Sequence, residues 1–284
     1  MPHSVAGSST VAEVNAVVER LWPLAGAEAW DAPGLLAGEP SAPVSKIHLA
    51  VDAVIDTVDE AIELGADLLL VHHPLLLRGV TTVAGSTYKG SVLAKLIKAD
   101  CALIAAHTNA DVVARGTSAV FAEKLGLVDP LAFDGSAEGL GRVGTLAAPT
   151  TLGAFAALVG EVIPATAGGI RVSGDFDSVI SRVALCGGAG DSFLAEASVL
   201  DADVYITSDL RHHPASEARE NARIAGGPAL IDVAHWASEW LWLDAAADQL
   251  RAELPGVTVT VSDLRTDPWD FVVVQDNRVE KLWR

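Results

Sequence analysis

Two copies of the triplet His-His-Pro occur in this chain of 284 residues, and histidine is the commonest side chain to bind metal ions. The first pair, His72 and His73, directly follows the apolar run ADLLLV, whereas the second pair, His212 and His213, follows ITSDLR. Adjacent side chains on an extended segment point in diverging directions, so one pair can serve two ions. The two triplets could be two copies of one working site, or only one of them could do chemistry.

Two further apolar runs end in candidate ligands. His107 and Asp111 come after ALIAA, and His235 and Glu239 come after ALIDVA. Positions 235 and 239 are four residues apart, which on a helix places both side chains on one face. Ligands of open parallel sheets collect outside the carboxyl ends of the strands, so we expect these groups to converge. Such mixed nitrogen and oxygen ligands suit Zn, Mn, Fe, Ni or Co rather than Ca.

The number of candidate ligands predicts two divalent metal ions per chain. One ion would not need five or six ligands, whereas two ions bridged by a carboxylate would use them and could hold a water for attack on a carbonyl, imine or phosphoryl centre. Each residue also has a structural alternative. A lone histidine at a strand end is usually a hydrogen-bonded turn residue, His235 could belong to a helix N-cap, and Glu239 could pair with a cation on a solvated face.

Alternating strand and helix signals must position these residues. Thr10 followed by Glu13 is a capping-box signature that opens an amphipathic helix. Strand signals then alternate with helix signals, the strands being KIHLAVDAV, ADLLLVHH and CALIAAH and the helices VDEAIELGA, SVLAKLIKA and SAVFAEKLGL. Continuously apolar strands between helices predict an α/β fold with mostly parallel sheets flanked by helices.

A second lobe is expected after residue 130, where the pattern lapses into Gly, Asp and Pro. Strand and helix signals then resume and include SRVALCGG, ADVYITSD, a helix from about Pro214, ALIDVAH, a long helix from about residue 235, VTVTVSD and DFVVVQ. The predicted organisation is a disordered tail over 1–10, a first lobe over 11–130 and a second over 131–284.

The two lobes look like an internal duplication. ADLLLV at 66–71 matches ADVYIT at 202–207, and ALIAAHTNAD matches ALIDVAHWASE so that His107 overlies His235 and Asp111 overlies Glu239. Any α/β protein can show some likeness between its own units, which is the alternative explanation.

The same alignment separates the two His-His-Pro triplets. It places His72 opposite Ser208, and the second triplet arrives four residues later, at the start of a helix whose first turn suits Pro214. We therefore expect His212 and His213 to cap, pack or line the cleft rather than bind metal. Only the first triplet is predicted to be a metal site.

Composition limits the other functions. Half of the residues are hydrophobic and 20% are charged, which is enough for a large core. The net charge of −18 argues against binding to duplex nucleic acid, which depends on Lys and Arg. No apolar run approaches the ~20 residues of a membrane span. The first residues do not form a secretory signal, and Cys101 and Cys186 lie in apolar runs, so we expect reduced thiols in a cytoplasmic protein.

Six segments of the sequence together resemble the NIF-three-like family, whose members are commonly named GTP cyclohydrolase 1 type 2 homologues. They are WDAPGLLAG, LLLVHHPLLLRG, AHTNAD, CGGAGDSFL, DVYITSDLRHHPASEA and AHWASE. The resemblance implies two interlinked, similar α/β lobes, with the helix from about 235 closing the metal site, and a ring-shaped hexamer of identical chains. Two departures are Ala32, where members often have a polar residue, and the lack of room for the extra domain that many members carry.

The resemblance also implies a ligand set. Glu239 would bridge two ions, His73 and Asp111 would complete one, and His72 and His235 would complete the other. His107 would lie in the second shell or transfer a proton.

Two functions remain open at this point. The first is a metal-dependent hydrolase that attacks a purine-type C8, an amide or a phosphoester, with Glu239 and Asp111 fixing the ions and His107 moving a proton. The alternative is a metal-binding interaction or regulatory module without turnover. Only Arg78, Lys89 and Lys95 lie near the first ligands in sequence, which is a thin set of cations for a triphosphate.

Overall fold

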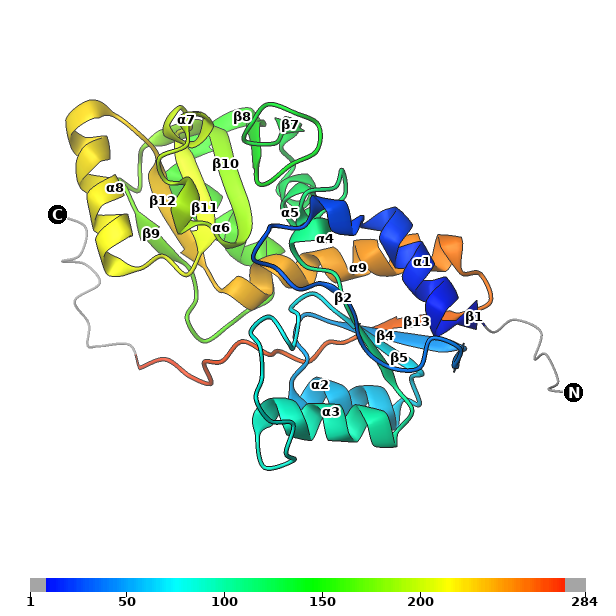
Figure 1. Cartoon of the computed structure of the whole chain (residues 1–284). Coiled ribbons are helices and arrows are strands. Elements are labelled where there is room, and N and C mark those ends of the chain that lie inside the picture. Colours follow the sequence, from blue (N-terminus) through cyan, green and yellow to red (C-terminus); the bar gives the residue numbers. More distant parts are fainter. Residues whose placement is uncertain (1–8, 274–284) are drawn as a thin grey trace, which may run out of the picture. The chain divides into compact units, whose positions relative to one another are not determined.

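The computed structural model describes residues 9–273 and divides into two compact units (Figure 1). The first unit contains the chain up to Val113 together with Trp242–Thr266, and the second contains Ala114–Leu241 and the residues from Asp267 onward. The division therefore falls before the boundary expected near residue 130, and the first unit also takes a late segment. Helix α5, Thr117–Lys124, packs against strands of the second unit, which explains the earlier boundary.

The first unit is built on a five-stranded sheet. Its order is β13-β4-β5-β6-β2, in which all neighbours are parallel except the edge strand β2. A separate antiparallel pair joins β1 to β3. The strands are β1 (Ser9–Thr10), β2 (Gly34–Ala37), β3 (Pro43–Val44), β4 (Lys46–Ala50), β5 (Leu68–Val71), β6 (Ala102–Ala105) and β13 (Thr258–Val261).

Helices cover both faces of this sheet. Every residue of β5 and β6 is buried, as expected of parallel strands with two covered faces. Helices α2 and α3 pack on one face, whereas α1 and the end of α9 lie over the other (Figure 1). The helical segments are α1 (Val11–Leu21), η1 (Leu24–Gly26), α2 (Ile55–Glu63), α3 (Tyr88–Lys98), α4 (Thr108–Asp111) and α9 (His235–Glu253).

The predicted capping box at the start of α1 is confirmed. Thr10 Oγ1 accepts a hydrogen bond from the Glu13 backbone N–H at 3.2 Å, and Glu13 accepts one from the Thr10 N–H at 2.7 Å. The tail predicted over 1–10 is wrong for Ser9 and Thr10, which form β1, because pairing with β3 satisfies their backbone groups. Residues 1–8 lie outside the described residues.

The second unit contains a six-stranded sheet of order β7-β8-β10-β11-β12-β9. Only β10, β11 and β12 are mutually parallel, so this sheet is mixed, whereas the first is mostly parallel. The elements are α5, β7 (Val128–Leu131), β8 (Arg142–Thr151), α6 (Leu152–Val162), β9 (Arg171–Ser173), β10 (Val179–Ala189), η2 (Asp191–Phe193), α7 (Ala197–Leu200), β11 (Val204–Ser208), α8 (His212–Ala225) and β12 (Ala229–Val233).

Both units share one frame, which supports the internal duplication. In each, three parallel strands are followed by an antiparallel edge strand, β4-β5-β6-β2 in the first and β10-β11-β12-β9 in the second. A carboxylate ties the frame together in the same way in both. Asp67 accepts hydrogen bonds from the backbone N–H groups of Ser45 and Lys46, which precede it by 22 and 21 positions. Asp203 accepts hydrogen bonds from the N–H groups of Ser181 and Arg182, which precede it by the same two separations.

The α/β class with helix-flanked sheets is confirmed, and one strand prediction is wrong. DFVVVQ was expected to form a strand, but residues 270–273 are exposed and belong to no strand. Val274 and Gln275 lie outside the described residues. Among the helices of residues 9–273, none is long and apolar enough to cross a membrane.

Candidate metal centre

The first His-His pair follows the end of β5, as predicted. The backbone N–H groups of His72 and His73 donate to the Val51 carbonyl at 3.1 and 2.9 Å, which holds the chain where it leaves the sheet. His72 is fully buried, whereas the His73 side chain is 26% exposed. The two rings therefore have different environments, one in the protein interior and one partly open to solvent.

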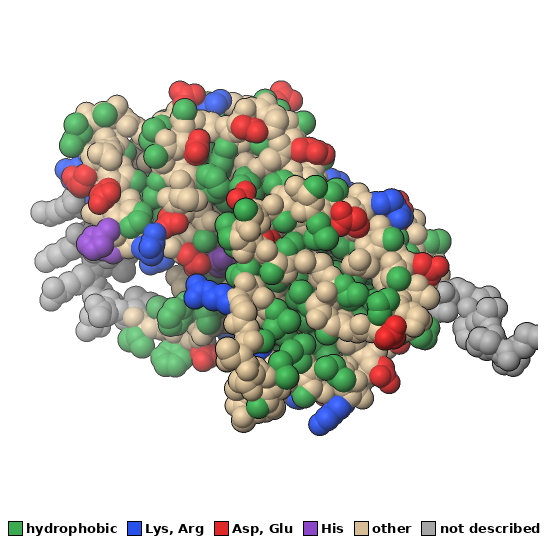
Figure 2. Space-filling model, viewed as in Figure 1, with side chains coloured by type: hydrophobic (Ala, Val, Ile, Leu, Met, Phe, Trp, Pro, Cys, Tyr) green, Lys and Arg blue, Asp and Glu red, His purple; other side chains and the backbone are tan. Residues whose placement is uncertain are grey.

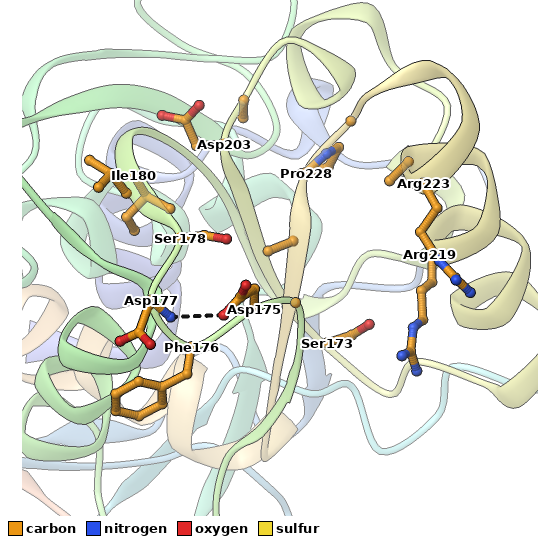
Figure 3. A pocket seen from close by; sticks show the side chains of 16 residues that line it. Ser173, Asp175, Phe176, Asp177, Ser178, Ile180, Asp203, Arg219, Arg223 and Pro228 are labelled. Atoms are coloured by element: carbon orange, nitrogen blue, oxygen red, sulfur yellow. Dashed lines mark hydrogen bonds between the residues drawn. The ribbon is translucent and has the colours of Figure 1, made fainter. Parts of the chain in front are cut away.

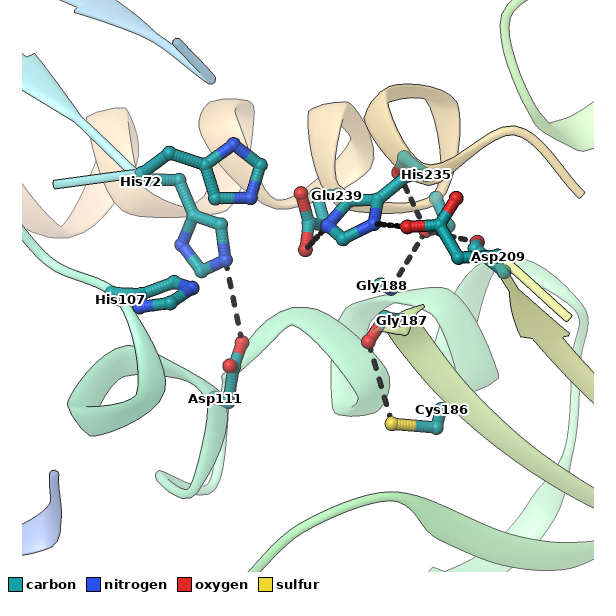
Figure 4. A network of polar contacts seen from close by, with 12 residues as sticks. His72, His107, Asp111, Cys186, Gly187, Gly188, Asp209, His235 and Glu239 are labelled. Carbon is teal, nitrogen blue, oxygen red and sulfur yellow. Dashed lines mark hydrogen bonds and ion pairs between the residues drawn. The ribbon is translucent and has the colours of Figure 1, made fainter. Parts of the chain in front are cut away.

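Three histidines of the first unit form a cluster at these strand ends. His72, His73 and His107 have candidate ligand nitrogens within 4.8 Å of one another, close enough for a shared metal. Asp111 lies at the end of α4, and its Oδ1 is 3.7 Å from His72 Nε2 (Figure 4). The structure thus brings together four of the six residues selected from the sequence, including His107, which the resemblance had left outside the ligand set.

Each of these histidines is held through its Nδ1 atom. His72 Nδ1 donates to the Ala106 carbonyl at 2.8 Å, His73 Nδ1 to Asp52 at 2.7 Å and His107 Nδ1 to Asp31 at 2.8 Å. A proton on Nδ1 leaves the lone pair of a neutral ring on Nε2, the tautomer that metal-ligating histidines have. The cluster is therefore oriented to present Nε2 atoms.

Asp31 and Asp52 were not selected from the sequence. The Asp31 side chain is fully buried and also accepts hydrogen bonds from the backbone and side chain of Thr108, and Asp52 accepts one from Thr266. Burial alone would raise the pKa of Asp31, but the hydrogen bonds from His107 and Thr108 outweigh it and keep the pKa below its usual value. An ionised Asp31 is a strong acceptor for the His107 ring.

His107 itself is neutral near pH 7. Burial, with the neighbouring His72 ring, lowers the pKa of His107 to about 4 despite the opposing effect of Asp31. A neutral imidazole with Nδ1 protonated can either coordinate a metal or accept a proton at Nε2. Proton transfer, one of the two roles that the resemblance implies for His107, is therefore chemically open to it.

The second unit carries a His-carboxylate pair in the first turns of α9. His235 Nδ1 donates to Asp209 at 2.7 Å, and His235 Nε2 lies 2.9 Å from Glu239 Oε1 (Figure 4). Glu239 is only 4% exposed, so it is not the solvated helix residue of the structural alternative. Asp209 was missed in the sequence. It has φ +57°, a backbone conformation that is uncommon for a residue other than glycine and often marks functional positions.

A glycine makes room for this pair. Gly188 has φ +71°, and a Cβ there would lie 2.4 Å from Glu239 Oε1 and 3.2 Å from His235 Nε2. Its N–H donates to Ser238 Oγ at 2.9 Å, which joins the end of β10 to α9. The close approach of Glu239 to this glycine could not be inferred from the CGGAG sequence.

The second His-His pair lies where the register predicted. His212 and His213 are the first two residues of α8, exposed, with their rings 5.2 Å apart. The helix begins two residues before Pro214, and exposure excludes packing in the core. Across residues 9–273, neither histidine belongs to a group of side chains close enough to hold a metal.

A cavity of 1110 Å³ in the second unit is lined by other residues. Arg219 and Arg223 of α8 face Asp175 and Ser173 across it (Figure 3). Asp175 is tied to the Asp177 backbone N–H at 3.1 Å, and none of the lining residues is a candidate metal ligand. The cavity therefore shares no lining residue with the candidate metal ligands.

Arg78, Lys89 and Lys95 are the basic residues that lie near the first ligands in sequence. Lys95 forms an ion pair with Asp59, so its charge is already compensated. On the face shown in Figure 2, Lys and Arg occur singly among acidic side chains. Neither observation provides a concentrated anion-binding surface.

Comparison with known proteins gives consistent matches over most of the described chain. The model of the family described as Duf34/NIF3 (NGG1p interacting factor 3) matches residues 9–268. A Streptomyces coelicolor relative named GTP cyclohydrolase 1 type 2 homolog is 48% identical, over 91% of this chain and 93% of the relative. A Mycobacterium leprae relative of the same name is 35% identical over 98% and 99% of the two chains. That alignment spans 388 positions, so the mycobacterial protein has additional residues that this chain lacks.

Solved structures agree with the sequence relatives. The Bacillus cereus protein related to NIF3 has a TM-score of 0.84 at 23% identity, covering 94% of this chain and all of that one, which supports the fold. The Staphylococcus aureus hypothetical protein SA1388 has a TM-score of 0.83 at 28% identity, covering 93% and 99%. With the family model matching nearly every described residue and a relative sharing almost half of its residues, this chain belongs to the Duf34/NIF3 family.

Proposed function

We propose that this protein is a metal-dependent hydrolase that holds two divalent ions with His72, His73, Asp111, His235 and Glu239. The observation that carries the proposal is the shared setting of its histidines. Each has Nδ1 hydrogen-bonded to a carboxylate or a carbonyl, which is how proteins orient histidine ligands. Imidazole and carboxylate donors fit Zn, Mn, Fe, Ni or Co, and availability decides among these metals.

Helix α9 supports the joint use of both ligand groups. Its Trp242 belongs to the first unit, where its ring lies 5.5 Å from the His72 ring. Glu239 precedes Trp242 by three residues, about one helical turn. We propose that this turn brings Glu239 and His235 to the histidine cluster, with Glu239 as the bridging carboxylate.

The proposed chemistry divides between the ions and the chain. When bound, divalent ions would supply Lewis acidity and lower the pKa of water for hydrolysis. His107 would accept or return a proton at Nε2, since its low pKa keeps the ring neutral near pH 7. Three carboxylates would fix the orientation of the histidine rings through hydrogen bonds to Nδ1, namely Asp31, Asp52 and Asp209.

The substrate class proposed is a small molecule, and the relatives' name suggests a purine derivative such as GTP. The cluster's own surroundings give weak support for a triphosphate, because Lys95 is engaged by Asp59. The same observation favours, as a second candidate, a metal-binding interaction or regulatory module without turnover. A hexameric ring of identical chains, a cytoplasmic location and the absence of duplex nucleic acid as a partner belong to the proposal as well.

Metal analysis tests the site. Protein purified without chelator should contain about two ions per chain by plasma mass spectrometry. Glu239→Ala should lower this value, whereas Glu253→Ala should not, because Glu253 lies at the far end of the same helix in an exposed ion pair with Arg20. Fewer than about one ion per wild-type chain contradicts both candidate functions.

Turnover separates the two candidates. The metal-loaded protein is incubated with GTP and a panel of phosphoesters, and release of formate or phosphate is measured. The hydrolase proposal expects release that is lost in His73→Ala and kept in His212→Ala, since His212 is an exposed residue of α8. A metal-loaded protein that releases neither product favours the binding module.

A further inference from the structure

Trp30 is a large apolar side chain left exposed beside the histidine cluster. It is 60% exposed, and its ring contacts the His107 ring edge-on, with centroids 5.8 Å apart and planes at 78°. His107 in turn contacts the rings of His72 and His73. An edge-on contact with a single small ring covers only part of an indole, so aromatic surface remains open next to the candidate metal ligands.

The backbone that carries Trp30 is fixed rather than loose. The Glu28 N–H donates to Thr108 Oγ1 at 2.9 Å, and the Asp31 N–H donates to the Glu28 carbonyl at 2.9 Å. The Asp31 carboxylate is buried and bonded to His107 and Thr108. These bonds tie the segment 28–31 to the start of α4, so the indole is held at a defined place instead of reaching the interior.

We propose that Trp30 determines specificity by stacking against a planar heteroaromatic ring of the substrate. This inference rests on the proposed hydrolase function and names what its site recognises. An exposed indole fixed beside reacting groups is a platform on which a base or related ring can stack with its reacting carbon toward His107. Lys95, one of three cations near the first ligands in sequence, is paired with Asp59, so we expect the ring of the substrate to carry more of the recognition than its phosphates.

The test uses guanosine, which has the ring without phosphate, and ribose, which has neither. Equilibrium dialysis against the metal-loaded protein measures both ligands for wild type, Trp30→Leu and Trp30→Phe. Trp269→Leu is the matched control, because Trp269 is a similarly exposed tryptophan, 68%, in the second unit. Metal content is measured on every sample.

We expect guanosine to bind and ribose not to bind. Trp30→Leu should weaken guanosine binding on the order of tenfold or more, whereas Trp30→Phe should stay within about threefold of wild type. Trp269→Leu should leave binding unchanged, and no variant should change the metal content. Loss in leucine but not in phenylalanine assigns the effect to aromatic stacking, because leucine fills similar apolar space.

Each failure has a distinct meaning. Metal-loaded wild type that does not bind guanosine, or binds ribose equally, overturns the inference, as does a Trp30→Leu variant with wild-type affinity. If Trp30→Phe is as weak as Trp30→Leu, stacking is also overturned. A wild type that carries no metal, yet shows the contrast between the two Trp30 variants, contradicts the hydrolase and leaves the aromatic platform standing.

Discussion

The two units end corresponding strands with different chemistry on the same frame. The first unit places His72 and His73 directly after β5, whereas the matching positions of the second unit are Ser208, the last residue of β11, and Asp209, which follows it. His73 is itself a candidate ligand, but Asp209 orients another histidine, His235. One position of the duplicated frame thus has a candidate ligand in one unit and a supporting carboxylate in the other.

The ends of β4 and β10 differ in a related way. In the register that aligns the two frames, Asp52 corresponds to Gly188. Asp52 supports His73, whereas Gly188 has no side chain and leaves room for Glu239. At this position the first unit therefore has a carboxylate that holds a histidine, whereas the second has space that a carboxylate occupies.

Replacing His73 with aspartate, the residue at the matching position of the second unit, should have the largest effect. His73→Asp places the residue of position 209 into the histidine cluster and removes an imidazole ligand. We expect metal affinity to fall by more than about a hundredfold, the upper range for residues that only support ligands. His213→Asp is the matched control, because it changes the same member of the second His-His pair. Equal affinities of the two variants, measured by competition with a chelator, would contradict the assignment of His73.

Removing the supporting carboxylates should have a smaller effect that differs between the units. Asp209→Asn should weaken metal binding about 10- to 100-fold, because it releases the proposed ligand His235. Asp31→Asn releases His107, which is not among the proposed ligands, and should change the metal affinity less. Asp31 is buried and bonded to Thr108, so Asp31→Asn should also lower the free energy of unfolding by about 1–3 kcal/mol. Asp209 has a side chain 62% exposed, so its variant should unfold like wild type. Equal denaturant midpoints for the two variants would contradict the expectation that only Asp31→Asn lowers the free energy of unfolding.

Filling the space at Gly188 tests the second unit alone. Gly188→Ala adds a Cβ that overlaps Glu239 at a positive φ, and we expect a loss of about 2 kcal/mol in stability together with weaker metal binding. Gly187→Ala is the control, since its Cβ would meet Thr117 at an ordinary 3.4 Å. Thermal unfolding of both variants gives the comparison. A Gly188→Ala protein as stable as Gly187→Ala would mean that Glu239 can move away without cost.

The sequence predicted the ligands better than their supports, for a physical reason. His72 and His107 each follow a continuously apolar strand, and the ends of such parallel strands meet at one edge of a sheet. His235 follows the strand ALIDV of the other sheet, where the spacing to Glu239 was the further signal. Asp31 lies 76 residues from the histidine it holds, and no periodicity marks such a pair. The mixed second sheet was also missed, because the alternation of strand and helix signals around β8 indicated parallel pairing and β9 gave no strand signal.

The smallest effect concerns the pH dependence of stability in metal-free protein. The pKa of His107 is about 4 in the fold, below the ordinary value of 6.5, so the unfolded chain binds the proton more readily between these values. Stability should therefore fall as the pH drops through this window, with His107 contributing about 1 kcal/mol between pH 7 and 5.5. Asp31, with a lowered pKa, loses its contribution only below about pH 4, because its ordinary value is 3.8. Denaturant unfolding of His107→Gln should show a shallower pH dependence than wild type, and parallel curves would mean that His107 is protonated as easily in the fold as in the unfolded chain.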